Sequence, residues 1–379
     1  MQKHLHRPPL SKTNELDLCI TSGSLDGLTK SFEMLVSAGD QVLIEQPLCS
    51  HVISALKPLE CTIVPLETDS HGITPSSLAQ ISKCGNNNNS MKFLYTSPNG
   101  SIPAGITTTL ERKEMVYKFA QENDLLILEN DPYSFLQYTK EPEPSYLSMD
   151  VDGRVLRFDS LSAVISPGLQ IGYVTGAKAL IERIVLHVMV SSMHVSTLSQ
   201  VMTLELLKEL GYDGFKDYTN SVAEFFKDKL KVVLRAADKY LKDSIEWTVP
   251  QGGVCLWMKL KNGYQYVGEF EETTGSSHII FASGKHFFVD PPNHATDYIV
   301  AFFYYCFEDS DDSIDYKHVW VCCMDISVIS ETAKWFFQKY LFIVNSLKRL
   351  ISSTHDATNN LNTACMFVAL VPKILNSIA

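Results

Sequence analysis

The first half of the chain alternates short apolar runs with longer amphipathic stretches. The apolar runs are about six residues long and rich in Leu, Ile and Val, which is typical of strands buried on both faces of a sheet. They are LDLCIT at 16–21, QVLIEQ at 41–46, CTIVPL at 61–66, MKFLYT at 91–96, LLILEN at 125–130, RVLRFD at 154–159 and IGYVT at 171–175.

The stretches between these runs have helical spacing. Leu25, Leu28, Phe32 and Leu35 recur every three or four residues, and Ser24 stands before them as the expected N-cap. The segment 110–123 (LERKEMVYKFAQEN) has a similar pattern. Alternating strands and helices predict an α/β fold, a mostly parallel sheet with helices on both faces.

The pattern changes after about residue 180. Helical segments are predicted at 178–190, 197–210 and 212–241, followed by strand-like segments at 247–260, 277–290 and 297–307. We therefore expect a large domain over 1–190, a smaller α+β domain over 191–307 entered by a long helix, and an atypical tail over 308–379. The asparagine run at 86–89 is expected to be a solvated loop tip.

Composition excludes several classes of function. The 379 residues carry a net charge of −11, and the pI is about 5.5, which argues against a nucleic-acid or anionic-membrane partner. The nine cysteines are odd in number and form no C-x-x-C pair, so neither a disulfide framework nor a zinc ribbon is expected, and no metal site is predicted. The basic N-terminus lacks the apolar stretch of a secretory signal. A cytoplasmic or mitochondrial-matrix protein that is not secreted is the expected class.

Common nucleotide, metalloprotease and hydrolase motifs are absent, but four turns follow predicted strands. Ser22 and Ser24 open a helix and could hold a phosphate, although most such turns bind nothing. Asp131 ends an apolar strand, where a carboxylate must be a helix cap or a ligand contact. The four segments are TSGSLDGL at 21–28, LYTSPNGSIPAG at 94–105, LILENDPYSF at 126–135 and DSLSAVISPGLQIGY at 159–173.

Taken in order, these segments resemble fold-type-I pyridoxal-phosphate aminotransferases, specifically the kynurenine/2-aminoadipate aminotransferase group. PNGSIPAG stands where the family has PNGxNPTG, and ENDPY, SMDVDGRV, ISPGLQIGY and VPQGGVCLW extend the likeness over about 16–303. The resemblance implies the fold of that family, a dimer, pyridoxal 5'-phosphate as cofactor, and amino acids and 2-oxo acids as substrates. It also implies that the start of the large domain is missing.

The resemblance assigns roles to several residues that match the family. Asp131 matches the partner of the cofactor's pyridinium nitrogen. Ser22 and Ser24 match the phosphate turn, and Ser160 and Ser162 match the hydroxyls that flank the family's Schiff-base lysine.

Other family positions carry different residues. The lysine position is Ala163, between matching residues on both sides, and the phosphate arginine is Gln170. The substrate-carboxylate arginine is Val300. The remaining replacements are Ile102 for the asparagine and Ser134 for the tyrosine that bond the cofactor's O3', and Leu25 in the phosphate turn. Lys92, Lys113 and Lys178 fall in strand or surface-helix patterns and are poor substitutes for the lysine.

A missing lysine removes both covalent capture of the cofactor and the general acid/base, and the latter alone is typically worth about 10²–10⁴-fold in rate. We therefore expect a catalytically inactive homologue of an aminotransferase that passes amino groups to 2-oxoglutarate. Three alternatives stay open: an active transaminase, a non-covalent binder of pyridoxal phosphate or another phosphate ester, and a regulatory dimer partner of an active paralogue.

Overall fold

The computed structural model describes residues 15–84, 91–139, 143–261 and 282–303. The asparagine run at 86–89 and the tail at 308–379 lie outside the described residues. Contacts between residues divide the chain into two compact units, and in the described part the smaller unit is Gln200–Gly211.

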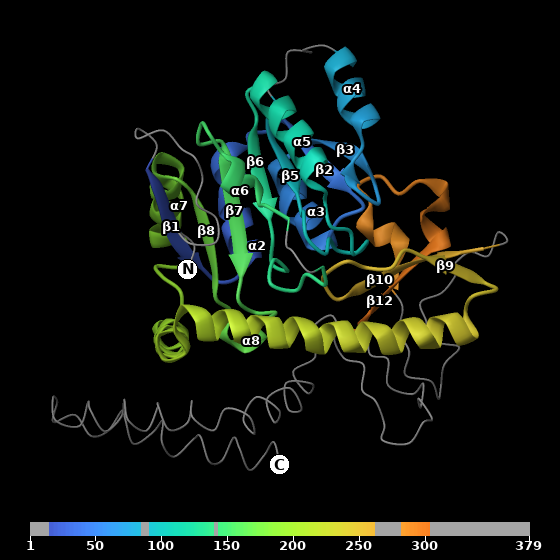
Figure 1. The fold of residues 1–379 in the computed structure, drawn as a ribbon. Helices are drawn as coiled ribbons and strands as arrows, with labels where there is room; N and C mark the ends of the chain where they lie inside the picture. Colours follow the sequence, from blue (N-terminus) through green and yellow to red (C-terminus); the bar gives the residue numbers. More distant parts are fainter. Residues whose placement is uncertain (1–14, 85–90, 140–142, 262–281, 304–379) are drawn as a thin grey trace. The chain divides into compact units, whose positions relative to one another are not determined.

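An eight-stranded sheet forms the centre of the larger unit, with the order β1-β8-β7-β6-β5-β2-β3-β4 (Figure 1). The strands from β7 through β6, β5 and β2 to β3 are parallel, whereas β1, β8 and β4 pair antiparallel with their neighbours. The predicted parallel α/β sheet is confirmed. The strands are β1 (Leu16–Thr21), β2 (Gln41–Gln46), β3 (Thr62–Asp69), β4 (Gly72–Ile73), β5 (Met91–Thr96), β6 (Leu126–Asn130), β7 (Val155–Ser160) and β8 (Gly172–Ala177).

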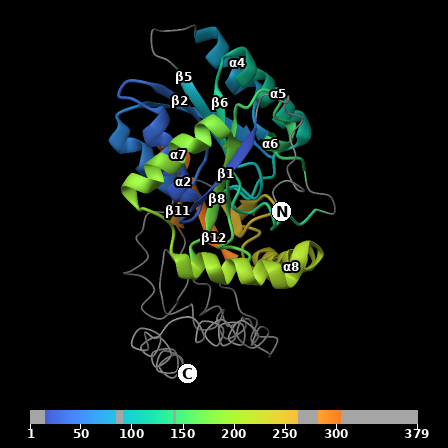
Figure 2. The same ribbon diagram turned by 90° about the vertical axis from the view of Figure 1, so that its left-hand side faces the viewer.

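Helices cover both faces of the sheet, as the pattern predicted (Figure 2). Alternate strand residues point to opposite faces, so Ile44 and Phe158 pack with one set of helices and Leu43 and Val155 with the other. The first set is α2 (Ser24–Leu35), α3 (Ser50–Leu56) and α7 (Lys178–Ser191); the second is α4 (Pro75–Cys84), α5 (Leu110–Glu122) and α6 (Tyr146–Met149).

Helix α2 begins differently from the prediction. Its N-cap is Gly23, at φ 85° and ψ 172°, and Ser24 is the first helical residue. No side chain caps the helix. The expectation that Ser24 is the N-cap was therefore wrong. Glycine occupies the capping position because a side chain is strained at that positive φ.

A second, antiparallel sheet has the order β11-β12-β10-β9. Its strands are β9 (Ile245–Trp247), β10 (Cys255–Leu260), β11 (Ala282–Ser283) and β12 (Tyr298–Phe302), and helix α8 (Thr197–Tyr240) precedes them with a non-helical Gly211 inside it. Short 3₁₀ helices lie at Lys57–Leu59, Pro167–Leu169, Gly284–Phe287 and Asn293–Asp297. The predicted long helix and smaller α+β region are present, while the domain boundary near residue 190 stays a prediction.

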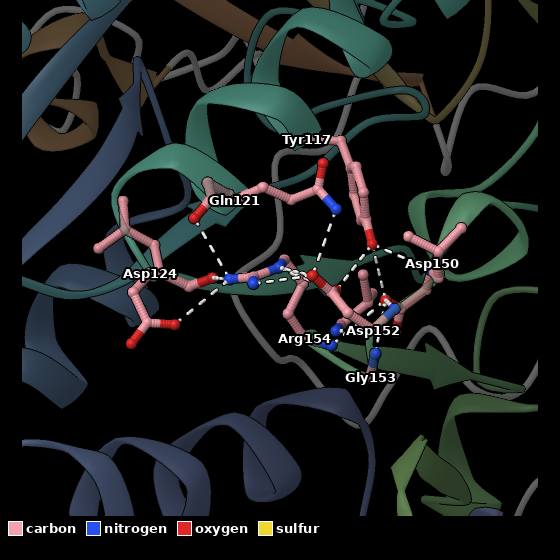
Figure 3. A network of polar contacts seen from close by, with 11 residues as sticks. Tyr117, Gln121, Asp124, Asp150, Asp152, Gly153 and Arg154 are labelled. Atoms are coloured by element: carbon pink, nitrogen blue, oxygen red, sulfur yellow. Dashed lines mark hydrogen bonds and ion pairs between the residues drawn. The ribbon is translucent and has the colours of Figure 1, made fainter. Parts of the chain in front are cut away.

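A polar network fixes the amino ends of β6 and β7 (Figure 3). Asp150 accepts four backbone N–H groups, those of Asp152, Gly153, Arg154 and Val155, at 3.0–3.3 Å. The Tyr117 hydroxyl from α5 lies 3.0 Å from Asp150 Oδ1 and 2.9 Å from Asp152 Oδ1. We call Tyr117, Asp150, Asp152 and Arg154 the loop network.

Arg154 closes the loop network against the start of β6. Its Nε and Nη2 donate to Asp152, while Nη1 donates to the carbonyl of Leu125 at 2.8 Å and that of Ala120 at 3.2 Å. The guanidinium therefore links the β7 side of the loop to the end of α5. In the described part of the chain, no helix combines the length and apolarity needed to cross a bilayer.

Candidate functional site

Several predicted site residues meet at one edge of the large sheet. Because β7, β6, β5 and β2 run parallel, their carboxyl ends share this edge, where α/β proteins place ligands. β1 ends there too, since Thr21 pairs with Gly172 at the start of β8. We call the following set the sheet-edge site: Ser22–Ser24, Glu45, Ser97–Asn99, Asp131, Ser160–Ala163 and Gln170.

Arg157 on β7 holds the carboxylates of this site. Its guanidinium lies 2.9 Å from Glu129 Oε1, 2.8 Å from Asp131 Oδ2 and 2.8 Å from Asp159 Oδ1. All four side chains are buried. Glu129 also accepts the N–H groups of Tyr146 and Leu147 at the start of α6. We call Arg157, Glu129, Asp131 and Asp159 the arginine cluster.

Burial and charge oppose each other in the arginine cluster. Burial alone would lower the pKa of Arg157, but the three carboxylates outweigh it and raise that pKa well above its usual range. Burial raises the pKa of Glu129, although Arg157 acts against the shift. Lys113 from α5 is also buried, which lowers its pKa, and its ammonium donates to the Pro144 carbonyl at 2.8 Å. Because its pKa is raised, Arg157 keeps its charge.

Asp131 has one oxygen with partners and one without. Asp131 Oδ2 accepts from Asn99 Nδ2 at 2.7 Å and pairs with Arg157. Asp131 Oδ1 and Asn99 Oδ1 are buried, and neither has a hydrogen-bond partner among the described residues. An unmet buried acceptor costs about 1–3 kcal/mol, and more when it is charged. Such a pair of acceptors is a place for a ligand that donates hydrogen bonds.

The predicted phosphate turn lies beside the start of β8. A Cβ on Gly172 would collide with Gly23, and a Cβ on Gly23 would lie 3.5 Å from Gln170 Oε1. Ser160, at the end of β7, pairs with Gly172, and its hydroxyl accepts the Ser162 N–H at 3.2 Å. The structure therefore brings the predicted phosphate residues together around Gly23 and Gly172.

An acidic side chain already occupies this turn. Asp26 Oδ2 accepts the N–H of Ser22 at 3.0 Å, and Asp26 Oδ1 pairs with Lys30 one turn along α2. Gln170 donates to the Pro167 carbonyl at 2.9 Å. Among the described residues, no lysine or arginine donates a hydrogen bond to the side chains of Ser22, Ser24, Ser160, Ser162 or Gln170. Leu25 is exposed.

At the position predicted for the family's lysine, the side chain is a methyl group. Ala163 is half-buried in the turn between β7 and β8, directly after Ser162. The three lysines considered as substitutes are engaged elsewhere: Lys92 pairs with Asp40, Lys113 with the Pro144 carbonyl, and Lys178 with Glu15.

The other positions predicted to differ from the family are divided between the two sheets. Ile102 and Ser134 are half-buried in the loops after β5 and β6, the loops that carry Asn99 and Asp131. Val300 is fully buried on β12 of the second sheet, between β11 and β10. The two sheets meet where Gly100 packs against Gly253 with no room for a Cβ.

The sequence alone did not point to four residues at or beside the site: Arg157, Glu129, Asn99 and Glu45. Arg157 and Glu129 lie inside an apolar strand pattern that predicts only burial. Asn99 lies in the PNGSIPAG motif, which indicates the family but not a role for this residue. A charged residue within an apolar strand was the available signal, because burial requires a partner. Glu45 is a fourth buried carboxyl: it accepts from Thr96 Oγ1 at 2.6 Å and from the Ser97 N–H, and burial raises its pKa to about 7. Within the described ranges, no cluster of His, Cys, Asp and Glu could hold a metal ion.

This fold is that of pyridoxal-phosphate-dependent aminotransferases. The family model "Aminotransferase class I and II" matches residues 1–294, and the chain belongs to that family. It is 45% identical over 301 residues to the mitochondrial kynurenine/alpha-aminoadipate aminotransferase of Rattus norvegicus, covering 76% of this chain and 71% of that protein. An aromatic amino acid aminotransferase of Schizosaccharomyces pombe is 32% identical over 282 residues, covering 69% of this chain and 60% of that protein.

Solved structures agree on the fold. The kynurenine aminotransferase of Pyrococcus horikoshii superimposes with a TM-score of 0.72 at 23% identity, covering 80% of this chain and 73% of that one. The residues present fit the family's cofactor only in part. The unpartnered Asp131 Oδ1 fits a ring nitrogen that carries a proton. The Ala163 side chain has no group that forms a covalent bond with the cofactor, and among the described residues no lysine or arginine donates to the serine side chains beside Gly23.

Proposed function

We propose that this chain is an aminotransferase homologue that does not transfer amino groups. The observation that carries the proposal is Ala163, which stands between Ser162 and the β8 strand where the family has its lysine. A methyl group can neither attack the cofactor aldehyde nor carry a proton between substrate and cofactor. Any ligand at this site is then held without a covalent bond.

The surrounding replacements support the same conclusion. Gln170 and Val300 stand at the positions of two arginines, each of which would contribute a charge-assisted contact of about 1.5–3 kcal/mol to an anion. Ile102 and Ser134 replace the two groups that bond the cofactor's O3'. Asp131, by contrast, is present and paired with Arg157, so the proposed losses fall at other positions.

Incubation with pyridoxal phosphate followed by borohydride tests the proposal. The native chain is expected to show only the spectrum of free cofactor, retain no label after reduction and form no product from kynurenine or 2-aminoadipate with 2-oxoglutarate. The variant Ala163→Lys should gain a visible absorbance band and one covalently fixed cofactor per chain. Ala163→Met, matched in length but not nucleophilic, is the control. A stoichiometric label on the native chain would falsify the proposal.

A second candidate role is to pair with another aminotransferase subunit. Helix α7 leaves an apolar stripe uncovered, in which Val190 is 85% exposed and Met193, just after the helix, 73% exposed. β1 lies against α7, and its Leu18 and Ile20 are also exposed (Figure 2). Exposed apolar patches of this kind mark protein interfaces. The partner would be a second copy of this chain or an active paralogue.

Sedimentation of the purified chain, alone and mixed with an active paralogue, tests this role. Val190→Asp together with Met193→Asp should abolish any dimer while leaving the circular dichroism spectrum unchanged. A strictly monomeric native chain that also fails to bind the paralogue would rule the role out.

A cytoplasmic or mitochondrial location is part of the proposal; the rodent and bovine relatives are named mitochondrial.

A further inference from the structure

The sheet-edge site contains two buried acceptors that no donor of the described residues satisfies. Asp131 Oδ1 and Asn99 Oδ1 are unpartnered, and the single donor between them, Asn99 Nδ2, is already bonded to Asp131 Oδ2. Both residues are at least nine-tenths buried, with 1% and 2% exposure. A ligand that satisfies the two acceptors must bring its own N–H or O–H groups.

The charge of the arginine cluster adds a second requirement. Three carboxylates, those of Glu129, Asp131 and Asp159, surround Arg157, with Lys113 as the further nearby cation. These five groups carry one unit of negative charge when all are ionised. An excess charge in a buried place is costly unless an opposite charge compensates it. A cationic donor at Asp131 Oδ1 would neutralise the cluster.

The turn around Gly23, which is the predicted phosphate turn, is unfavourable for a phosphate group. A phosphate monoester brings about 1.5–2 negative charges and requires donors and cations. Asp26 has taken the Ser22 N–H, and its carboxylate would repel an anion placed there. Lys30 is bound to Asp26, and Gln170 donates its N–H to the Pro167 carbonyl. What remains is the N-terminus of α2 and the serine hydroxyls.

We propose that the sheet-edge site binds a protonated nitrogen heterocycle that carries no phosphate group, held by a charge-assisted hydrogen bond to Asp131. The proposal rests on the proposed function, because a site without a lysine must hold its ligand non-covalently. The chain thus keeps the contact for the ring nitrogen and no longer selects the phosphorylated form. Because the site is expected to prefer a ligand without phosphate, this proposal differs from a simple loss of cofactor binding.

Isothermal titration of the full-length chain with pyridoxine, pyridoxal phosphate and inorganic phosphate tests the selectivity. Pyridoxine, a pyridine ring without phosphate, is expected to bind at least about tenfold more tightly than pyridoxal phosphate, and inorganic phosphate not at all. Asp131→Asn should weaken pyridoxine binding by about 10–100-fold, the range of one charge-assisted hydrogen bond. Its circular dichroism spectrum should match the native one.

A gain-of-binding variant makes the test two-sided. Gln170→Arg should raise the affinity for pyridoxal phosphate by about tenfold or more, since it returns a cation to the turn at Gly23. Gln80→Arg, on the exposed side of α4, adds the same charge elsewhere and should change nothing.

The inference is overturned if pyridoxal phosphate binds the native chain more tightly than pyridoxine, if pyridoxine fails to bind at millimolar concentration, or if Asp131→Asn leaves its affinity unchanged. Failure of the proposed function has a different signature. Borohydride would then fix the cofactor on the native chain. A native chain without label that nevertheless prefers pyridoxal phosphate would overturn this inference alone.

Discussion

Strand β7 has an arginine and aspartates at each end, and the two groups differ in how completely they are bonded. At the amino end, Asp150 in the loop network accepts four backbone N–H groups and contacts the Tyr117 hydroxyl (Figure 3). At the carboxyl end, Asp131 in the arginine cluster leaves one buried oxygen unpartnered. The first arrangement is complete without a ligand and the second is not.

The difference separates a structural network from a binding site. Both contain buried carboxylates beside an arginine, so neither residue type nor burial distinguishes them. In Asp150, every donor comes from the protein, and the carboxylate shapes the loop into β7. In Asp131, the protein supplies donors to one oxygen only. Unmet acceptors at the carboxyl end of a parallel sheet point to a ligand.

The largest expected effect compares the two arginines. Arg157→Met should lower the free energy of unfolding by about 3–5 kcal/mol, because three buried carboxylates lose their counter-charge. Arg154→Met should cost about 1–2 kcal/mol, since Asp152 is partly exposed and can be solvated. Urea unfolding at pH 7 measures both, with Arg183→Met on the exposed side of α7 as control. Equal losses for the two arginines would remove the distinction between the networks.

The next prediction distinguishes the effect of burying a carboxyl from the effect of leaving one of its oxygens without a hydrogen bond. Glu45 is buried like Asp131, but Thr96 and Ser97 donate to its two oxygens. Burial raises its pKa to about 7 in the folded chain from 4.5. The folded state therefore binds a proton more tightly than the unfolded state, and the stability gained below pH 4.5 is lost as pH rises to about 7.

Glu45→Gln, which cannot ionise, should escape that loss. Its unfolding free energy relative to the native chain should rise by up to about 3 kcal/mol between pH 4.5 and 7 and level off above. Chemical unfolding across this range measures the difference, with exposed Glu67→Gln as control. A flat difference would mean that the pKa of Glu45 is the same in the folded and unfolded states, and that its hydrogen bonds compensate for burial.

A smaller effect concerns the loop network alone. Tyr117→Phe removes the hydroxyl shared by Asp150 and Asp152, which should cost about 1–2 kcal/mol of unfolding free energy. Asp124→Asn is the control beside this network, because the Asp124 carboxyl is fully exposed and 3.9 Å from Arg154. Neither variant should change ligand binding. If Tyr117→Phe altered pyridoxine affinity, the two ends of β7 would be coupled.

Local pattern predicted much of this molecule, and spatial pairing accounts for what it missed. The strand runs and the amphipathic helices each depend on a short stretch of sequence, so their order predicted the sheet. The start of α2 was misplaced because a positive φ at Gly23 overrides the usual preference for a serine cap. Arg157 was missed because two of its three partners, Glu129 and Asp131, come from a distant segment, β6 and the loop after it. The missing partner of Asp131 Oδ1 cannot be seen in any single segment.

The smallest expected change in stability is that of the variant Asp131→Asn. Asp131→Asn keeps the shape of the side chain and removes the excess negative charge, while Arg157 keeps Glu129 and Asp159. The unfolding free energy should therefore stay within about 1 kcal/mol of the native value, although pyridoxine binding falls. Urea unfolding and titration of one protein sample measure the two quantities together. A loss as large as that of Arg157→Met would make Asp131 a structural residue like Asp150, and the unpartnered oxygen would then no longer argue for a ligand.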